Sequence, residues 1–275
     1  MNEWLATVFL GLVEGVTEFL PISSTGHLLL AESLIGSSRS EFFNIGIQAG
    51  AILAVVFVYW EKLKEMALNW RQLETFHLIG KISLAFLLTA ILGLASRKAG
   101  ISLDDSNPRA IAWAFILGAG LIFTAEQSRW RGTSENVSWM AAAAIGIAQV
   151  IAGIFPGTSR SAATIMSAML IGVNRSVATE FSFILGIPTM FAASGYSLLK
   201  EVHSNGMPDQ WGQFTLGFVV STLSAFVVVK WLIGFVRSHT FRGFAWYRLV
   251  LGIGILLWLG GFSLENAFSF AFFKH

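Results

Sequence analysis

The chain has 275 residues, of which 55% are hydrophobic and only 12% are charged, and its formal net charge is +2 at pH 7. The charged share is about half that of an average soluble domain, so the composition excludes an ordinary soluble protein. The small net charge and the absence of a basic run give no indication of a nucleic-acid partner. The chain has no cysteine, which excludes disulfides and thiolate metal sites. These numbers predict a protein that lies in a lipid bilayer.

The first apolar region, residues 4–20, is interrupted in an unusual way. It contains Glu14 and Glu18, breaks at Pro21, and continues as the short apolar stretch Leu28–Ile35. At about 1.5 Å per residue, this second limb is too short to cross a hydrocarbon core of about 30 Å. The pattern predicts a re-entrant hairpin of two helices rather than a span.

The remaining elements follow in two sets of spans, separated by a second broken region. Residues 139–155 run to Pro156, and a short stretch to Val173 follows, which predicts a second re-entrant hairpin. Ordinary spans are predicted at residues 44–60, 78–95, 110–125, 178–199, 214–235 and 247–264. The predicted fold class is an all-α polytopic membrane protein with six transmembrane helices and two re-entrant helical hairpins.

The two broken regions resemble each other. An offset of 135 pairs Gly11 with Gly146, Glu14 with Gln149, Pro21 with Pro156, Ser23 with Thr158 and Ser24 with Ser159. Three spans separate the hairpins, so the second half enters the membrane with the opposite orientation, as in transporters built from inverted repeats. The alternative is a chance likeness between two apolar segments. We predict a single transmembrane domain, 1–275, built of two inverted repeats, about 1–130 and 136–275.

Lysine and arginine predict the orientation, because they are enriched in cytoplasmic loops. One side has nine of them: Lys62, Lys64, Arg71, Arg129, Arg131, Arg175, Arg237, Arg242 and Arg248. The other side has six: Arg39, Arg97, Lys98, Arg109, Lys200 and Lys274. The larger group predicts the cytoplasmic side, which puts both termini outside the cytoplasm.

Glu14 and Glu18 are the carboxylates that the first hairpin brings into the membrane. Because they are four residues apart, they share one face of a helix. Each costs roughly 2.5–3.5 kcal/mol within a membrane segment, so a compensating partner is expected. A divalent cation, Mg²⁺ or Ca²⁺, held by these oxygens and a substrate phosphate is the functional interpretation. The alternative is an interfacial helix with both carboxylates hydrated.

Hydroxyl groups gather at the start of the helix after Pro21. Ser23, Ser24 and Thr25 are typical N-cap residues, but a helix start is also an anion-binding site. His27 is close in sequence, and a hydroxyl beside an imidazole makes a nucleophile–base pair. These residues predict either a capped helix or a site of phosphate chemistry.

Arg160 is the cation of the second break, between Ser159 and Ser161. Its planar guanidinium suits bidentate recognition of phosphate. If the two hairpin tips meet, Arg160 faces the Ser24 loop; the alternative is a structural salt bridge to Glu14 or Glu18. Gln48 and Asn44 are candidates to line the same cavity, with helix–helix hydrogen bonding as their alternative.

The string EGVTEFLPISSTGH at Glu14–His27 and the string PGTSRSAAT at Pro156–Thr164 resemble the two signature regions of the bacterial undecaprenyl-diphosphatase family, the bacitracin-resistance phosphatases. The resemblance extends to FNIGIQAGAILAVV at Phe43–Val56 and EFSFILGIPTM at Glu180–Met190. It implies an active site formed by Glu14, Glu18, Ser23, Ser24, His27 and Arg160. It further implies a divalent cation and release of phosphate from undecaprenyl diphosphate, which recycles the carrier lipid for wall synthesis. The expected location is the bacterial inner membrane, with the site facing the periplasm or the outside.

STGH and TSRS also superficially resemble the signature of lipid phosphatases related to phosphatidic-acid phosphatase. That signature has a His six residues after its Arg and an Asp four residues further on. Here these positions are Met166 and Leu170, so the resemblance fails at the nucleophilic His.

The expected mechanism is phosphoryl transfer by positioning and charge neutralisation. Arg160 is expected to bind the diphosphate with Thr25, Ser159, Ser161 and Gln48. Ser24 is the favoured nucleophile and His27 the general base or acid; Ser23 and a metal-activated water are the alternatives. The rival class is a transporter or flippase for a polyprenyl phosphate. The sequence leaves a homodimer open.

Overall fold

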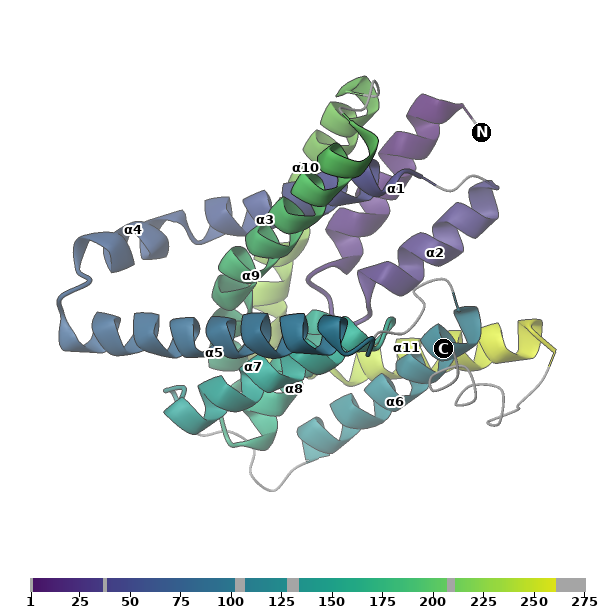
Figure 1. The fold of residues 1–275 in the computed structure, drawn as a ribbon. Coiled ribbons are helices and arrows are strands. Elements are labelled where there is room, and N and C mark those ends of the chain that lie inside the picture. The colour runs from purple at the N-terminus through teal and green to yellow at the C-terminus, as the bar shows by residue number, and fades with distance from the viewer. Residues whose placement is uncertain (1, 37–38, 102–106, 128–133, 207–210, 261–275) are drawn as a thin grey trace.

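The computed structural model describes residues 2–36, 39–101, 107–127, 134–206 and 211–260 (Figure 1). Within these ranges the regular elements are all α-helices, which confirms the all-α prediction. They are α1 (Glu3–Thr17), α2 (Ser24–Ile35), α3 (Glu41–Val58), α4 (Trp60–Leu68), α5 (Leu73–Lys98), α6 (Pro108–Gln127), α7 (Trp139–Ile154), α8 (Arg160–Leu170), α9 (Arg175–Asn205), α10 (Trp211–Ser238) and α11 (Arg242–Trp258).

Five helices are long and apolar enough to cross a membrane, namely α3, α5, α6, α9 and α10. They correspond to the first five predicted spans, so the polytopic membrane fold is confirmed. The sixth predicted span, 247–264, begins within α11, which has 17 residues. Residues 261–264 lie outside the described residues, so the sixth span stays a prediction.

Both predicted breaks occur, and each is followed by a short helix. The helices after the breaks, α2 and α8, have 12 and 11 residues, roughly 17–18 Å at 1.5 Å per residue. Each short helix packs against the helix before its break, α2 against α1 and α8 against α7. Neither short helix is long enough to cross the membrane, as a re-entrant hairpin requires.

The backbone turns in the same way at the two breaks. Ser23 and Ser159 precede α2 and α8 with φ of 75° and 71°, and among the described residues they are the non-glycine positions with positive φ. Such a conformation costs on the order of 1–3 kcal/mol and persists where the surroundings impose it. Ser23 therefore corresponds to Ser159, and Ser24 to Arg160. The offset of 135 is wrong by one residue here, because the second break has one more residue after its proline.

The first limb of each hairpin packs against a helix of the other half. In Figure 1, α1 lies with α3 and α10, whereas α7 lies along α5. A Cβ on Gly11 would lie 3.0 Å from the carbonyl oxygen of Gly217, and one on Gly146 would lie 2.7 Å from that of Ala85. The two glycines, matched in the sequence, therefore have the same function of allowing close helix contact.

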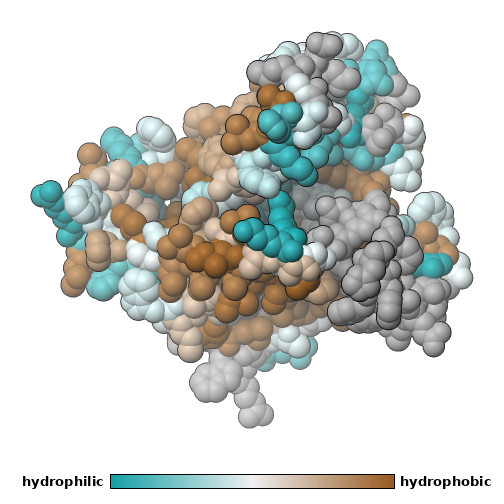
Figure 2. All heavy atoms as spheres, in the orientation of Figure 1, coloured by the Kyte–Doolittle hydropathy of each residue, from teal (hydrophilic) through white to brown (hydrophobic). Residues whose placement is uncertain are grey.

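The surface fits a lipid environment. Hydrophobic residues cover a broad part of the face in Figure 2, and α5 and α10 expose large apolar side chains such as Ile91 and Val227. These apolar side chains lie on the surface and not in the protein core, and the hydrocarbon interior of a membrane accommodates them.

One of the nine arginines and lysines counted toward the cytoplasmic side was misassigned. Arg248 is counted with the loop residues in the sequence analysis, but α11 begins at Arg242 and the Arg248 side chain is completely buried. A buried arginine in a helix does not contribute to the charge of a loop. The excess of Lys and Arg on the predicted cytoplasmic side is therefore smaller than nine against six.

The packing beside α9 gives a test of sidedness. Ser134 pairs with the residues just before α9, and Ser204 lies in its last turn. The 31 residues of α9 extend roughly 46 Å. Because the chain has no cysteine, Ser134→Cys and Ser204→Cys can be labelled singly in whole cells. We expect an impermeant maleimide to reach Cys at 204 from outside and Cys at 134 only after permeabilisation; labelling of both from one side would contradict a spanning α9.

Candidate active site

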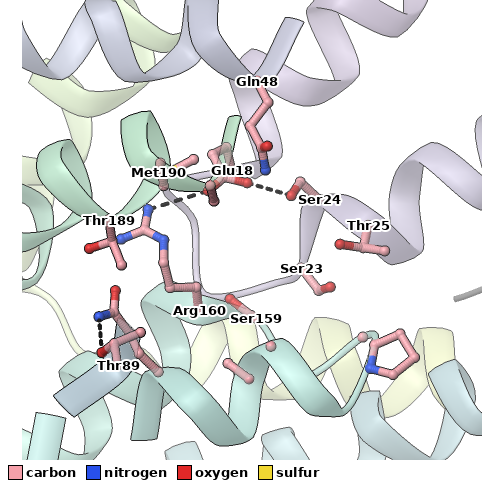
Figure 3. A pocket seen from close by; sticks show the side chains of 16 residues that line it. Glu18, Ser23, Ser24, Thr25, Gln48, Thr89, Ser159, Arg160, Thr189 and Met190 are labelled. Carbon is pink, nitrogen blue, oxygen red and sulfur yellow. Dashed lines mark hydrogen bonds and ion pairs between the residues drawn. The ribbon is translucent and has the colours of Figure 1, made fainter. Parts of the chain in front are cut away.

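A cavity of about 280 Å³ opens between the two breaks and the helices α3, α5, α7 and α9. Its polar lining includes Glu18, Ser23, Ser24, Thr25, Gln48, Thr89, Gln149, Ser159, Arg160 and Thr189 (Figure 3). The cavity thus brings together residues that are more than 130 positions apart in the sequence.

Glu18 connects the two breaks across this cavity. The Ser24 hydroxyl donates a hydrogen bond of 2.5 Å to Glu18 Oε2. Arg160 Nη2 lies 3.3 Å from Glu18 Oε1 (Figure 3). The salt bridge between Arg160 and Glu18, considered above as the alternative to phosphate recognition, is therefore formed, and it uses one edge of the guanidinium. Arg160 Nε is buried and has no hydrogen-bond partner among the described residues, so the cation retains donor capacity.

Local helix geometry explains why these side chains converge. Glu18 is the C-terminal cap of α1, whereas Ser24 and Arg160 are the first residues of α2 and α8. The N-terminal turns of both short helices therefore begin at the cavity, and the positive dipole end of a helix start favours an anion. The Ser23 side chain makes no capping hydrogen bond, so it does not compete for the N–H groups of α2.

Two predicted substrate-binding serines have structural contacts. The Ser159 hydroxyl accepts from Ala162 N at 3.2 Å and so caps α8, although it also lines the cavity. The fully buried Ser161 hydroxyl donates to Leu20 O at 2.9 Å and joins the second hairpin to the first break. Four predicted residues, namely Glu14, His27, Ser161 and Asn44, are not among the residues that line the cavity, whereas Thr25 and Gln48 are.

His27 does not pair with the Ser24 hydroxyl in this arrangement. Its Nδ1 lies 2.6 Å from Ser23 O and its Nε2 lies 2.7 Å from Tyr247 Oη. A carbonyl only accepts, so Nδ1 donates, and in the neutral ring Nε2 then accepts from the tyrosine hydroxyl. The ring also stacks on Tyr247. The structure thus gives the Ser24 hydroxyl a carboxylate partner instead of the predicted imidazole; the role of His27 as general base stays a prediction.

Glu18 lines the cavity and Glu14 lies one helical turn before it, so this pair is the candidate for holding a cation together with a phosphate oxygen. Glu14 is 2% exposed, and its Oε2 has no hydrogen-bond partner among the described residues. Within those residues no group of three or more His, Cys, Asp or Glu could hold a metal by itself. One orphaned carboxylate oxygen and a second carboxylate fit Mg²⁺, which takes one or two carboxylates and completes its shell with water and phosphate.

The cavity has further polar residues that were not predicted to line it. Gln149 Nε2 donates to Thr89 Oγ1 at 2.9 Å, and Gln149 Oε1 has no partner among the described residues. Thr189 also lines the cavity. The pairing of Glu14 with Gln149 at offset 135 was the signal for Gln149; nothing in the apolar spans distinguished the two threonines.

The fold and the cavity define a class, namely a polytopic α-helical membrane protein with a polar site enclosed at two helix breaks. The chain belongs to the family described as bacitracin resistance protein BacA, whose family model matches residues 7–254.

Curated relatives are similar over nearly the whole chain. It is 49% identical over 257 residues to the undecaprenyl-diphosphatase of Rhizobium etli (strain CIAT 652), covering 92% of this chain and 96% of the relative. It is 49% identical over 263 residues to the undecaprenyl-diphosphatase of Xylella fastidiosa (strain Temecula1 / ATCC 700964), covering 94% and 100%. It is 47% identical over 262 residues to that of Xanthomonas oryzae pv. oryzae (strain PXO99A), covering 94% and 98%. The resemblance inferred from the two signature strings is confirmed.

The approach of Arg160 to α9 gives a test of its role. A Cβ on Gly186 would lie 2.6 Å from Arg160 Nη1, whereas one on Gly195 in the same helix meets nothing within 4 Å. We expect Gly186→Ala to displace the guanidinium and to weaken binding of a non-hydrolysable diphosphate lipid analogue by about tenfold or more, the loss of one hydrogen bond to a charged group. Calorimetric titration in detergent measures the affinity. Equal affinity in Gly186→Ala and Gly195→Ala would remove Arg160 from the binding site.

Proposed function

We propose that this protein hydrolyses undecaprenyl diphosphate to undecaprenyl phosphate and inorganic phosphate, and so recycles the carrier lipid of wall synthesis. The observation that carries the proposal is the Ser24–Glu18–Arg160 set, which brings a hydroxyl, its carboxylate acceptor and a guanidinium together in one cavity. The names of the relatives give the same activity for proteins that share almost half of this sequence. Regeneration of the carrier lipid also accounts for the bacitracin resistance in the family description.

In the proposed reaction the terminal phosphate lies between Arg160 and the first turn of α2. The Ser24 oxygen attacks phosphorus, its proton passes to Glu18, and the bond to the leaving undecaprenyl phosphate breaks. Water then releases inorganic phosphate from the serine ester. The 2.5 Å hydrogen bond from Ser24 to Glu18 supports Glu18 as the proton acceptor, because a general base must reach the proton that it removes. Ser23 and a metal-activated water remain the alternative nucleophiles.

We further propose that Glu14 and Glu18 hold a divalent cation, Mg²⁺ or Ca²⁺. When bound, it would neutralise negative charge on the diphosphate. Glu14 supplies an orphaned oxygen for such an ion, while Glu18 would share its carboxylate between the ion and Ser24.

The inverted repeat is also a proposal, with three supporting observations. Three long apolar helices, α3, α5 and α6, separate the hairpins. The two hairpins turn at serines of equivalent backbone conformation. The first limbs α1 and α7 pack against α10 and α5, one from each half.

The remaining proposals concern the setting of the site. The protein would lie in the bacterial inner membrane with the cavity open toward the periplasm or the outside. A homodimer stays a prediction that the site does not require, because residues of a single chain line the cavity.

The test of the function is phosphate release from undecaprenyl diphosphate by the detergent-purified protein, in which transport is impossible. We expect Ser24→Ala to lower turnover by several orders of magnitude, as loss of a nucleophile does, while affinity for a diphosphate lipid analogue changes little. Phosphate is measured colorimetrically and binding by titration.

Ser23→Ala is the matched control, since the Ser23 hydroxyl caps nothing and its removal should leave most of the turnover. Absence of phosphate release by the wild type would favour the transporter. Full turnover by a well-folded Ser24→Ala protein would favour metal-bound water, and loss in Ser23→Ala alone would move the nucleophile by one residue.

The cation proposal is tested with Glu14→Gln, because Glu18 also holds Ser24. Chelation should abolish phosphate release by the wild type, and Mg²⁺ or Ca²⁺ should restore it. Glu14→Gln should raise the Mg²⁺ concentration for half-maximal activity at least about tenfold, since even indirect partners of a metal ligand change affinity by ~10–100-fold. Glu41→Gln, at an exposed carboxylate in the first turn of α3, is the control. Activity in chelator, or an unchanged Mg²⁺ requirement in Glu14→Gln, would refute the assignment.

A further inference from the structure

Arg248 of α11 is completely buried and holds backbone from three parts of the chain. Its guanidinium donates to the carbonyl oxygens of Ala114 at 2.7 Å and Phe115 at 3.3 Å, both in α6. It also donates to Pro21 O at 3.3 Å in the first break and to Gly157 O at 3.0 Å in the second. One side chain therefore bonds to both breaks at once.

The position of these two carbonyls relates Arg248 to the site. Pro21 is three residues before Ser24, and Gly157 is three residues before Arg160. Arg248 itself is not among the residues that line the cavity. It lies behind the two strained turns, on the backbone from which the functional side chains project.

The energetics of this arrangement argue against a fortuitous contact. Among the described residues, no carboxylate lies within ion-pair distance of Arg248. An unpaired buried charge is costly unless hydrogen bonds satisfy it. Carbonyls at a helix break within the membrane equally need donors, because lipid offers none. Arg248 and the two breaks thus compensate each other, and removing the guanidinium would leave both sets of groups unsatisfied.

The neighbouring residues adapt to the same contact. Gly118 of α6 lies against the guanidinium, and a Cβ there would overlap with Arg248 Nη2, whereas a Cβ on Gly120 meets nothing within 4 Å. Tyr247, next to Arg248, bonds to His27, which in turn holds Ser23 O. Two consecutive residues of α11 therefore contact the backbone around the site by separate routes.

We propose that Arg248 is a positioning residue that sets the distance between the two breaks, so that Ser24 and Arg160 contact the same phosphate group. The proposal rests on the proposed phosphatase function. A lysine in this place would keep the charge, but its three donors radiate from one atom and do not match the planar fork that spans several carbonyls. The role is therefore specific to the guanidinium and not to a positive charge alone.

The experiment compares Arg248→Lys and Gly118→Ala with two controls in purified full-length protein. Gly118→Ala leaves Arg248 in the chain but displaces its guanidinium; Gly120→Ala is its control. Arg175→Lys is the control for a partly buried arginine with a structural role, since Arg175 pairs with Glu126 through bonds of 3.0 and 2.6 Å. Titration with a non-hydrolysable diphosphate lipid analogue counts the binding-competent molecules, and the rate of phosphate release is divided by that number.

We expect kcat per binding-competent molecule to fall about 10²-fold in Arg248→Lys and in Gly118→Ala, which is the typical effect of a misplacement of about 1 Å. Gly120→Ala and Arg175→Lys should retain the wild-type kcat, although Arg175→Lys lowers the thermal midpoint. A merely structural Arg248 would lower the midpoint and the number of competent molecules but not kcat per molecule.

Wild-type kcat per molecule in both Arg248→Lys and Gly118→Ala would overturn the proposal while the phosphatase function stands. If Arg248→Lys does not fold, Gly118→Ala decides alone. If the wild type releases no phosphate, the proposed function fails first, and that outcome is distinct because it is seen without any variant.

Discussion

The need to satisfy backbone polar groups at the two helix breaks is the constraint on which this structure depends. Lipid offers no hydrogen bonds, so each carbonyl freed by a break needs a donor from the protein. Ser161 donates to Leu20 O, His27 to Ser23 O, and Arg248 to Pro21 O and Gly157 O. These carbonyl acceptors are thus occupied by side chains, whereas the Ser23 hydroxyl caps none of the N–H groups that begin α2. The uncapped start of α2 at the cavity favours an anion there, as the proposed function requires.

The two hairpins have the same backbone conformation at their breaks but carry side chains with different functional groups. Ser24 and Arg160 follow equivalent serines with positive φ, so one hairpin presents a hydroxyl where the other presents a guanidinium. Glu14 and Gln149, paired in the sequence, differ in the same way, since one brings a charge and the other an amide. A symmetric site with two arginines would lack a nucleophile, and one with four carboxylates would repel a phosphate. In the proposed reaction, this asymmetry would let one cavity combine nucleophilic attack with anion binding.

The sequence predicted the breaks, five of the spans, and Glu18, Ser24, Gln48 and Arg160 in one cavity, because prolines, apolar length and intramembrane charges are local signals. The one-residue shift between the breaks was not predictable, since it depends on the positive φ of Ser23 and Ser159. The contacts of His27 with Tyr247 depend on how α11 packs, 220 residues away. The contacts of Arg248 were not predicted because its partners are backbone carbonyls. Every residue has such a carbonyl, so the residue types in the sequence do not show which carbonyls are bonded.

The charges near the two breaks explain why a cation would fit the proposed reaction. Arg160 and Arg248 together balance Glu14 and Glu18 when both carboxylates are ionised, and Arg160 already pairs with Glu18 at 3.3 Å. A diphosphate brings several further negative charges into surroundings where unpaired charge is costly. Displacement of Glu18 from Arg160 by the phosphate would free the guanidinium but leave Glu18 without its partner. In the proposed reaction, a divalent ion held by Glu14 and Glu18 would offset both deficits by supplying positive charge to the released carboxylate and to the phosphate. Glu14 Oε2 has no hydrogen-bond partner among the described residues, so a cation that binds there would break no existing hydrogen bond.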